Sequence, residues 1–195
     1  MTSQSERQGV SRALDVNRLE SYRAYLGLIA RLQLDHRLLK KVDASDLVQQ
    51  TFVKSLQGLE RFRGQTGAEL GAWLRQILAR TLANALRDQH RDKRDCFKER
   101  SLDAAMEASS ARLEAWLADP HSSPTLQAER NERLLRLSAA LMQLPEPQRE
   151  AIVLHHLQGL TVDAVADQLG RSASAVAGLV KRGMKQLRLA LLPAG

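Results

Sequence analysis

Apolar side chains recur at intervals of three or four residues along most of this chain, which is the spacing that places them on one face of an α-helix. Three such stretches occupy residues 14–32, 47–62 and 73–86, and two more occupy residues 134–144 and 151–157. Leu and Ala are frequent throughout the chain, and both residues favour helix over strand. The pattern therefore predicts an all-α protein.

A capping signal precedes the second of these stretches. Asp43 stands where a side-chain oxygen can accept a hydrogen bond from the first turn of a helix, and Asp46 follows three residues later as its expected reciprocal partner. We therefore expect a helix to begin at this point.

The segment TVDAVADQLGRSASAVAGLVKRGMKQL, residues 161–187, predicts two helices joined by a tight turn. Gly170 stands at the turn, where the backbone must adopt a positive φ angle. The small Ala166 lies four residues before this glycine and the apolar Val176 six residues after it, a spacing typical of a helix-turn-helix. The predicted caps of the two helices are Thr161 and Ser172.

The charge balance points to a polyanionic partner. The 195 residues carry a net charge of +7, and the sequence pI is about 10.1. Such a chain favours nucleic acid or an anionic membrane surface. No apolar run approaches the ~18 residues of a membrane span, and Gly178 and Gly183 weaken the last helix as a membrane-surface helix. We therefore expect DNA binding, without membrane insertion.

Charge and turn residues also divide the chain. Basic residues dominate residues 61–87 and the stretch after residue 168, whereas acids dominate residues 101–129. We predict two small helical domains, residues 12–91 and 129–192, joined by a flexible acidic linker at residues 92–128. The expected loop formers of this linker are Ser109, Ser110, Asp119, Pro120, Ser122, Ser123 and Pro124.

Both domains resemble one family. DASDLVQQTFVKSLQGLERFRG (residues 43–64) with AWLRQILARTLANALRDQHR (residues 72–91) resembles region 2 of bacterial RNA polymerase sigma factors. The segment LPEPQREAIVLHHLQGLTVDAVADQLGRSASAVAGLVKRGMKQLR (residues 144–188) resembles region 4. Nothing similar to region 3 lies between them, a plan that resembles the extracytoplasmic-function (ECF) class. The resemblance implies a non-catalytic factor that binds core RNA polymerase and promoter double-stranded DNA and directs transcription initiation.

The resemblance implies a docking helix for the polymerase around residues 46–59. Its expected polymerase-binding residues lie off the apolar face and are Asp46, Gln49, Gln50 and Lys54. Gln50 stands where the family usually has Glu, a departure that puts one charge contact implied by the resemblance in question. Asp46 also suits the first turn of a helix, where an acid stabilises the helix dipole.

The resemblance further implies that the helix around residues 73–90 and the loop before it contact the minus-ten promoter element. The expected DNA-binding residues there are Arg63, Arg75, Arg80, Asn84, Arg87 and Arg91. Arginine and asparagine suit contacts to phosphates and base edges. Trp73 could stack on an unstacked base, but its apolar neighbours Leu74 and Ile77 favour a core position.

The second helix of the helix-turn-helix is expected to read the minus-thirty-five element. Its expected DNA-binding residues are Arg171, Ser172, Ser174, Lys181, Arg182 and Lys185. Ala177 and Leu179 occupy positions where the family often has a basic residue, so few side chains remain for direct base readout. Some specificity would then come from DNA shape.

Other classes of function have less support. His155 and His156 are adjacent rather than at a metal-binding spacing, and no phosphate-binding glycine loop is present, so we expect no enzyme, cofactor, metal or small-molecule substrate. The single Cys96 excludes an internal disulfide framework. This low cysteine content and the lack of an apolar leader favour the cytoplasm. The alternative is a conventional helix-turn-helix transcriptional regulator. An anti-sigma factor remains open as a further partner.

Overall fold

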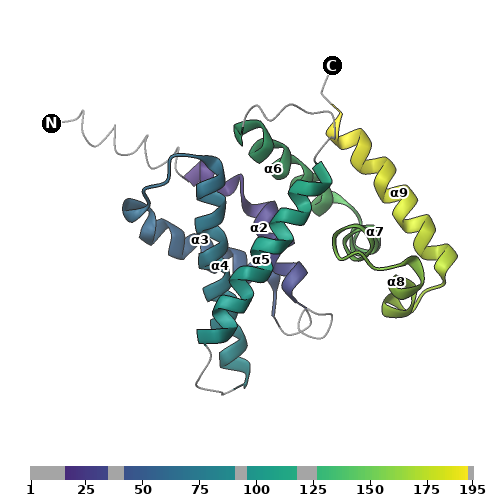
Figure 1. The fold of residues 1–195 in the computed structure, drawn as a ribbon, viewed down its shortest axis with the longest axis horizontal. Helices are drawn as coiled ribbons and strands as arrows, with labels where there is room; N and C mark the ends of the chain where they lie inside the picture. Colours follow the sequence, from purple (N-terminus) through teal and green to yellow (C-terminus); the bar gives the residue numbers. More distant parts are fainter. Residues whose placement is uncertain (1–15, 35–41, 91–95, 118–126, 193–195) are drawn as a thin grey trace. The chain divides into compact units, whose positions relative to one another are not determined.

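The computed structural model describes residues 16–34, 42–90, 96–117 and 127–192 (Figure 1). Arg91 and Asp119 lie outside these residues. Helices and short turns make up the described part of the chain, in which no strand occurs, so the all-α prediction is confirmed. The chain divides into two compact units, Met1–Glu107 and Ala108–Gly195. None of the described helices is both long and apolar enough to span a membrane.

The first unit is built on the helices α2 (Arg23–Gln33), α3 (Ala44–Gly58) and α4 (Gly67–His90), with a short 3-10 turn, η1 (Leu59–Arg61), after α3. These three helices contact one another pairwise. Leu74, Leu78 and Leu82 of α4 have no exposed surface, because they pack into the apolar interior. The predicted cap is confirmed, since the Asp43 side chain accepts a hydrogen bond of 2.7 Å from the Ser45 N–H.

Helix α5 (Cys96–Leu117) occupies more than half of the stretch that was expected to be a flexible linker. Ser109 and Ser110, which we expected in a loop, lie inside this helix and are buried, as are Met106 and Leu113. Residues 101–117 are rich in Ala, Leu and Glu, all strong helix formers. Their propensity outweighs the scattered serines, so this part of the acidic segment is helical.

The second unit contains α6 (Gln127–Gln143), α7 (Glu146–Ile152), a π-helical turn, η2 (Val153–Leu157), α8 (Val162–Leu169) and α9 (Ala173–Leu191). In Figure 1, α9 runs beside α7 and α8, and it contacts both helices and α6. A shared apolar cluster holds α7, η2, α8 and α9 together, formed by Ala151, Leu154, Val165, Ala166, Val176 and Leu179.

The turn between α8 and α9 has the predicted geometry. Gly170 adopts φ 62° and ψ 39°, the left-handed conformation that ends α8. The Thr161 hydroxyl accepts a hydrogen bond from the Ala164 N–H, and the Ser172 hydroxyl accepts one from the Ala175 N–H. Both predicted caps are thus confirmed.

Gly183 allows α9 to approach α7 closely. A Cβ atom at this position would lie 2.5 Å from Cδ1 of Ile152 and 3.3 Å from Cβ of Gln148. The glycine that weakens α9 as an isolated helix therefore serves the packing of the second unit.

Substituting two glycines should have effects of opposite sign. Gly170→Ala should lower the free energy of unfolding by about 1–2 kcal/mol, because an L-residue is strained at positive φ. Gly178→Ala is the matched control. It lies within α9, where a Cβ would meet only the flexible Arg182 side chain, so it should raise stability by up to about 1 kcal/mol. Chemical denaturation of both variants measures this, and equal effects would contradict the assigned turn.

Candidate nucleic-acid and protein interfaces

The outward face of α3 carries the first group of predicted residues. Asp46, Gln49 and Gln50 are all exposed. The structure brings them together with Val53 and Leu56, whose exposed fractions are 48% and 40%. Gln49, Val53 and Leu56 follow the helical spacing of four and three residues, so they share one stripe. This face is therefore polar at one end and apolar at the other.

Val53 and Leu56 belong to the apolar stretch at residues 47–62, whose helical spacing predicts one buried face, but both side chains are exposed. The apolar positions of α3 are too numerous for one face, and only Leu47, Val48 and Phe52 among its large side chains are buried. A helix whose apolar residues span more than one stripe signals a second contact surface. That signal was present in the sequence.

Lys54 follows Gln50 by four residues and lies at the edge of this face that borders α4. Its Nζ donates a hydrogen bond of 3.1 Å to the Thr81 hydroxyl of α4. Lys54 is thus off the apolar face, as expected, and its ammonium group reaches over the groove between α3 and α4.

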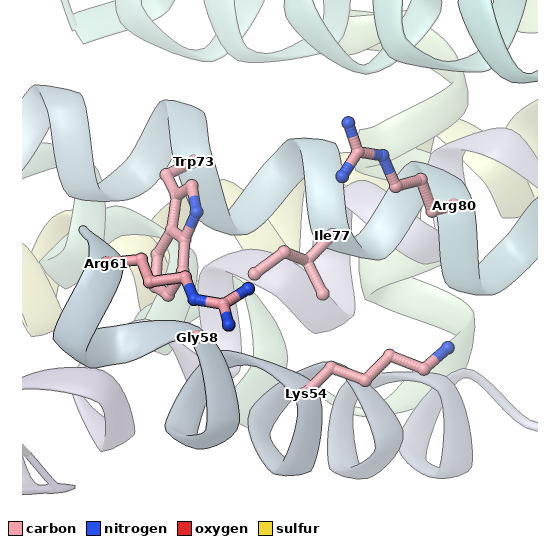
Figure 2. A pocket seen from close by; sticks show the side chains of 6 residues that line it. All are labelled: Lys54, Gly58, Arg61, Trp73, Ile77 and Arg80. Carbon is pink, nitrogen blue, oxygen red and sulfur yellow. The ribbon is translucent and has the colours of Figure 1, made fainter.

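A pocket of about 310 Å³ opens along this groove. Its walls are formed by Lys54, Gly58, Arg61, Trp73, Ile77 and Arg80. Figure 2 shows the Arg61 guanidinium beside Trp73 and Ile77, with Lys54 extended along the opposite helix, whereas the Arg80 guanidinium points away from Lys54. An apolar wall flanked by cations suits a ligand that combines a planar ring with a phosphate. We call this the α3–α4 pocket.

Trp73 combines the two roles considered for it. Its ring centroid is 4.9 Å from that of Phe62, and a Cβ at Gly58 would lie 3.3 Å from the indole. The ring is half-buried by these neighbours and also lines the α3–α4 pocket. It is thus a core residue on one side and a possible stacking surface on the other.

Arg75 does not lie on the exposed face of α4 where it was expected. It is only 8% exposed. Its Nη1 donates a hydrogen bond of 2.7 Å to the Tyr25 hydroxyl, and its Nη2 lies 3.4 Å from a Glu107 carboxylate oxygen on α5. Arg75 is therefore a structural residue that ties α2, α4 and α5 together within the first unit, and we leave it out of the DNA-contacting set.

The loop before α4 is held by a capping box. The Thr66 hydroxyl accepts from the Glu69 N–H, while the Glu69 carboxylate accepts from the N–H groups of Thr66 and Gln65. These backbone hydrogen bonds lower the pKa of Glu69. Arg63, the predicted DNA-binding residue here, is exposed and donates to the Glu60 carbonyl at 2.7 Å. The loop is thus ordered by its own residues.

The remaining predicted residues of α4 are exposed. Arg80, Asn84 and Arg87 recur at intervals of four and three residues, so they lie on one side of the helix. Asn84 Oδ1 accepts a hydrogen bond from Arg87. This hydrogen bond orients the Asn84 amide, whose NH₂ group is then turned away from Arg87.

The predicted residues of the second unit line the outside of α9 and the turn before it. Arg171, Ser174, Lys181 and Lys185 are exposed, opposite the buried Val176 stripe. Ser174, Lys181 and Lys185 are spaced by seven and four residues and share one face.

Arg182 flanks this face. Its guanidinium lies over Gly178, where a Cβ would be 3.2 Å from Nη1. Ser172 has a structural role as the cap of α9, and its hydroxyl also lies 3.2 Å from that of Ser174. The structure thus brings all six predicted residues to the start and outer surface of α9.

The Sigma-70 region 2 family model matches residues 19–92, and the Sigma-70, region 4 model matches residues 134–187. The ECF RNA polymerase sigma factor SigG of Mycobacterium tuberculosis is 31% identical over 154 residues, which cover 75% of this chain and 41% of that protein. The RNA polymerase sigma factor YlaC of Bacillus subtilis is 30% identical, over 74% of this chain and 75% of that protein. The RNA polymerase sigma-H factor of Pseudomonas aeruginosa is 28% identical over 186 residues, which cover 95% of this chain and 90% of that protein. The chain thus spans about two fifths of the length of SigG.

Replacing Arg75 should affect stability rather than DNA contacts. Arg75→Ala removes a buried charged hydrogen bond and leaves the Tyr25 hydroxyl without that donor, so the free energy of unfolding should fall by about 2–3 kcal/mol. Arg80→Ala, five residues along the same helix and exposed, should change it by less than about 0.5 kcal/mol. Urea denaturation provides the comparison. A native-like stability of Arg75→Ala would show that this arginine is not structural.

Proposed function

The chain belongs to the ECF class of RNA polymerase sigma factors, and we propose that it binds core RNA polymerase and directs it to promoter DNA to initiate transcription. The observation that carries this proposal is the pairing of two family regions, each of which presents a polar or basic helix face in this structure. We assign no chemical step to the chain itself. Its place of action would be that of the polymerase, the cytoplasm.

The polymerase would dock on the α3 face. Asp46, Gln49 and Gln50 supply polar contacts at one end of this face, while Val53 and Leu56 supply exposed apolar surface at the other. Protein interfaces gain much of their energy from apolar side chains that become buried, while polar contacts fix the orientation of the partner. Lys54 lies at the edge of this face, and we assign it no polymerase contact because its ammonium group is bonded to Thr81 of α4.

The minus-ten element would contact α4, the preceding loop and the α3–α4 pocket. Lys54 and Arg61 bring two cations to the pocket, where the Trp73 ring offers a stacking surface. Cations beside an aromatic ring suit single-stranded DNA, whose bases are free to stack and whose phosphates stay charged. Arg63, Arg80, Asn84 and Arg87 extend the same basic surface.

The minus-thirty-five element would be bound by α9 as double-stranded DNA. Ser174, Lys181 and Lys185 form its outer face, with Arg182 beside it. Ala175 and Ala177 offer methyl groups that could contact thymine but no hydrogen bonds. Lysines contact phosphates and fix register, so few residues remain to specify sequence.

The second candidate is a conventional helix-turn-helix regulator. The turn at Gly170 and the basic surface of α9 favour it as much as they favour a sigma factor. The two proposals differ only in the role of the first unit, because a conventional regulator does not need the α3 face for docking on polymerase. Such a regulator would bind DNA alone as a dimer.

The docking face can be tested with a matched variant on the same helix. Asp46→Arg combined with Gln49→Ala should abolish co-purification with tagged core polymerase, while circular dichroism stays native. Lys54→Ala should keep co-purification at the wild-type level, because its side chain faces α4. If Lys54→Ala loses the polymerase as fully as the double variant, the docking face has been placed on the wrong side of α3.

Two residues of α9 should affect promoter binding differently. Arg182→Ala should weaken binding by about 1–3 kcal/mol and relax specificity at one base pair, because arginine can bind guanine through two hydrogen bonds. Lys181→Ala should weaken binding to all sequences and reduce the salt slope by about one unit. Binding of holoenzyme to promoter fragments across a salt series measures both. Wild-type behaviour of both variants at every salt concentration would rule out α9 as the DNA-reading helix.

A further inference from the structure

Arg23, the first residue of α2, lies beside the proposed docking face of α3 and contacts Glu20, Phe52 and Gln49. Its guanidinium is paired with the Glu20 carboxylate, and the two groups share a second hydrogen bond of 2.9 Å. Its Cζ lies 4.8 Å from the ring centroid of Phe52 on α3, at a distance suited to a cation–π contact. The hydrogen bond to Arg23 lowers the pKa of Glu20, so the pair remains ionised.

The same guanidinium contacts Gln49. Arg23 Nη1 and Nη2 each lie 3.5 Å from Gln49 Oε1, so the contact is long but made by both nitrogens. A guanidinium has donors only, so the amide must turn its oxygen toward Arg23. The NH₂ group of Gln49 is then directed away from Arg23.

We propose that Arg23 is a positioning residue that orients Gln49 on the docking face, so that Gln49 offers its amide NH₂ to an acceptor on the polymerase. This inference rests on the proposed polymerase docking through α3. The matching group is a carboxylate or a main-chain carbonyl oxygen, because only an acceptor pairs with an NH₂ donor. Arg23 thereby links α2 to a surface that the sequence places on α3 alone.

The orientation of Gln49 affects the affinity for polymerase, because a freely rotating glutamine would lose conformational entropy when it binds. Fixing a rotamer-rich side chain at an interface opposes association, and prior positioning removes part of that opposition. Loss of Arg23 should therefore weaken polymerase binding by about two- to tenfold. The contact is long and exposed, so its effect on the stability of the free chain should be small.

A double-mutant cycle on the full chain tests the coupling. We would measure the dissociation constant for core polymerase with wild type, Arg23→Ala, Gln49→Ala and the double variant, and the thermal midpoint of each. Arg23→Ala should weaken binding about two- to tenfold when Gln49 is present and should have no further effect in Gln49→Ala. Arg18→Ala removes an equal charge from an exposed position nearby and should bind like wild type.

Gln49→Glu tests the direction of the hydrogen bond. Its carboxylate could still pair with Arg23 but offers no NH₂, so this variant should bind as weakly as Gln49→Ala. Wild-type affinity of Gln49→Glu would overturn the donor role of Gln49.

The remaining outcomes separate this inference from the docking proposal. Equal losses on removal of Arg23 in both backgrounds would overturn the positioning role alone, since Arg23 would then act without Gln49. An equal loss from Arg18→Ala would also overturn it, because the effect would be one of net charge. If Gln49→Ala itself binds polymerase like wild type, both the positioning role and the docking face fail.

Discussion

Burial of one apolar stripe on each helix determines which side chains of this protein face outward. On α4 the stripe consists of Leu74, Leu78 and Leu82, none of which has exposed surface. Burying three leucines contributes several kcal/mol, so the helix cannot rotate without a large loss. Trp73 and Ile77 are therefore fixed on the side toward the α3–α4 groove, and Arg80 lines the same pocket.

The second unit depends on the same constraint. Val176, Leu179 and Leu187 bury one stripe of α9, and Gly183 lets that stripe approach α7 closely. The opposite stripe is then exposed, and it carries the residues proposed to contact DNA. Gly170 completes the arrangement, because its left-handed conformation allows α9 to begin immediately after α8. Function at this end of the chain follows from packing rather than from any single charged residue.

Most of the local structure could be predicted from the sequence. Caps such as Asp43, Thr161 and Ser172 and the turn at Gly170 depend on residues close in the chain, and the structure confirms them. Helix α5 was missed because scattered serines and acids were interpreted as loop signals, although its other residues favour helix. Where residues of one segment favour different local structures, the summed preference of the whole segment decides which structure forms.

The errors at the candidate sites have a different origin. Periodicity shows which positions of a helix share a face, but it does not show whether that face packs against another helix or is exposed to solvent. Arg75 is polar and yet buried, because Tyr25 and Glu107 satisfy its guanidinium. Val53 is apolar and yet exposed, since the interior is filled by other residues of α3. Lys54 turns toward Thr81, a partner 27 residues away in the chain. Such contacts depend on tertiary packing.

Selection of DNA by the reconstituted holoenzyme is the sharpest test of the proposed sigma-factor function. Fragments of genomic DNA would be incubated with the chain, with core polymerase, or with both, and the retained fragments sequenced. A sigma factor should enrich two short elements at a fixed spacing, and only when chain and polymerase are both present. Enrichment of an inverted repeat by the chain alone, with no change on adding polymerase, would contradict this function.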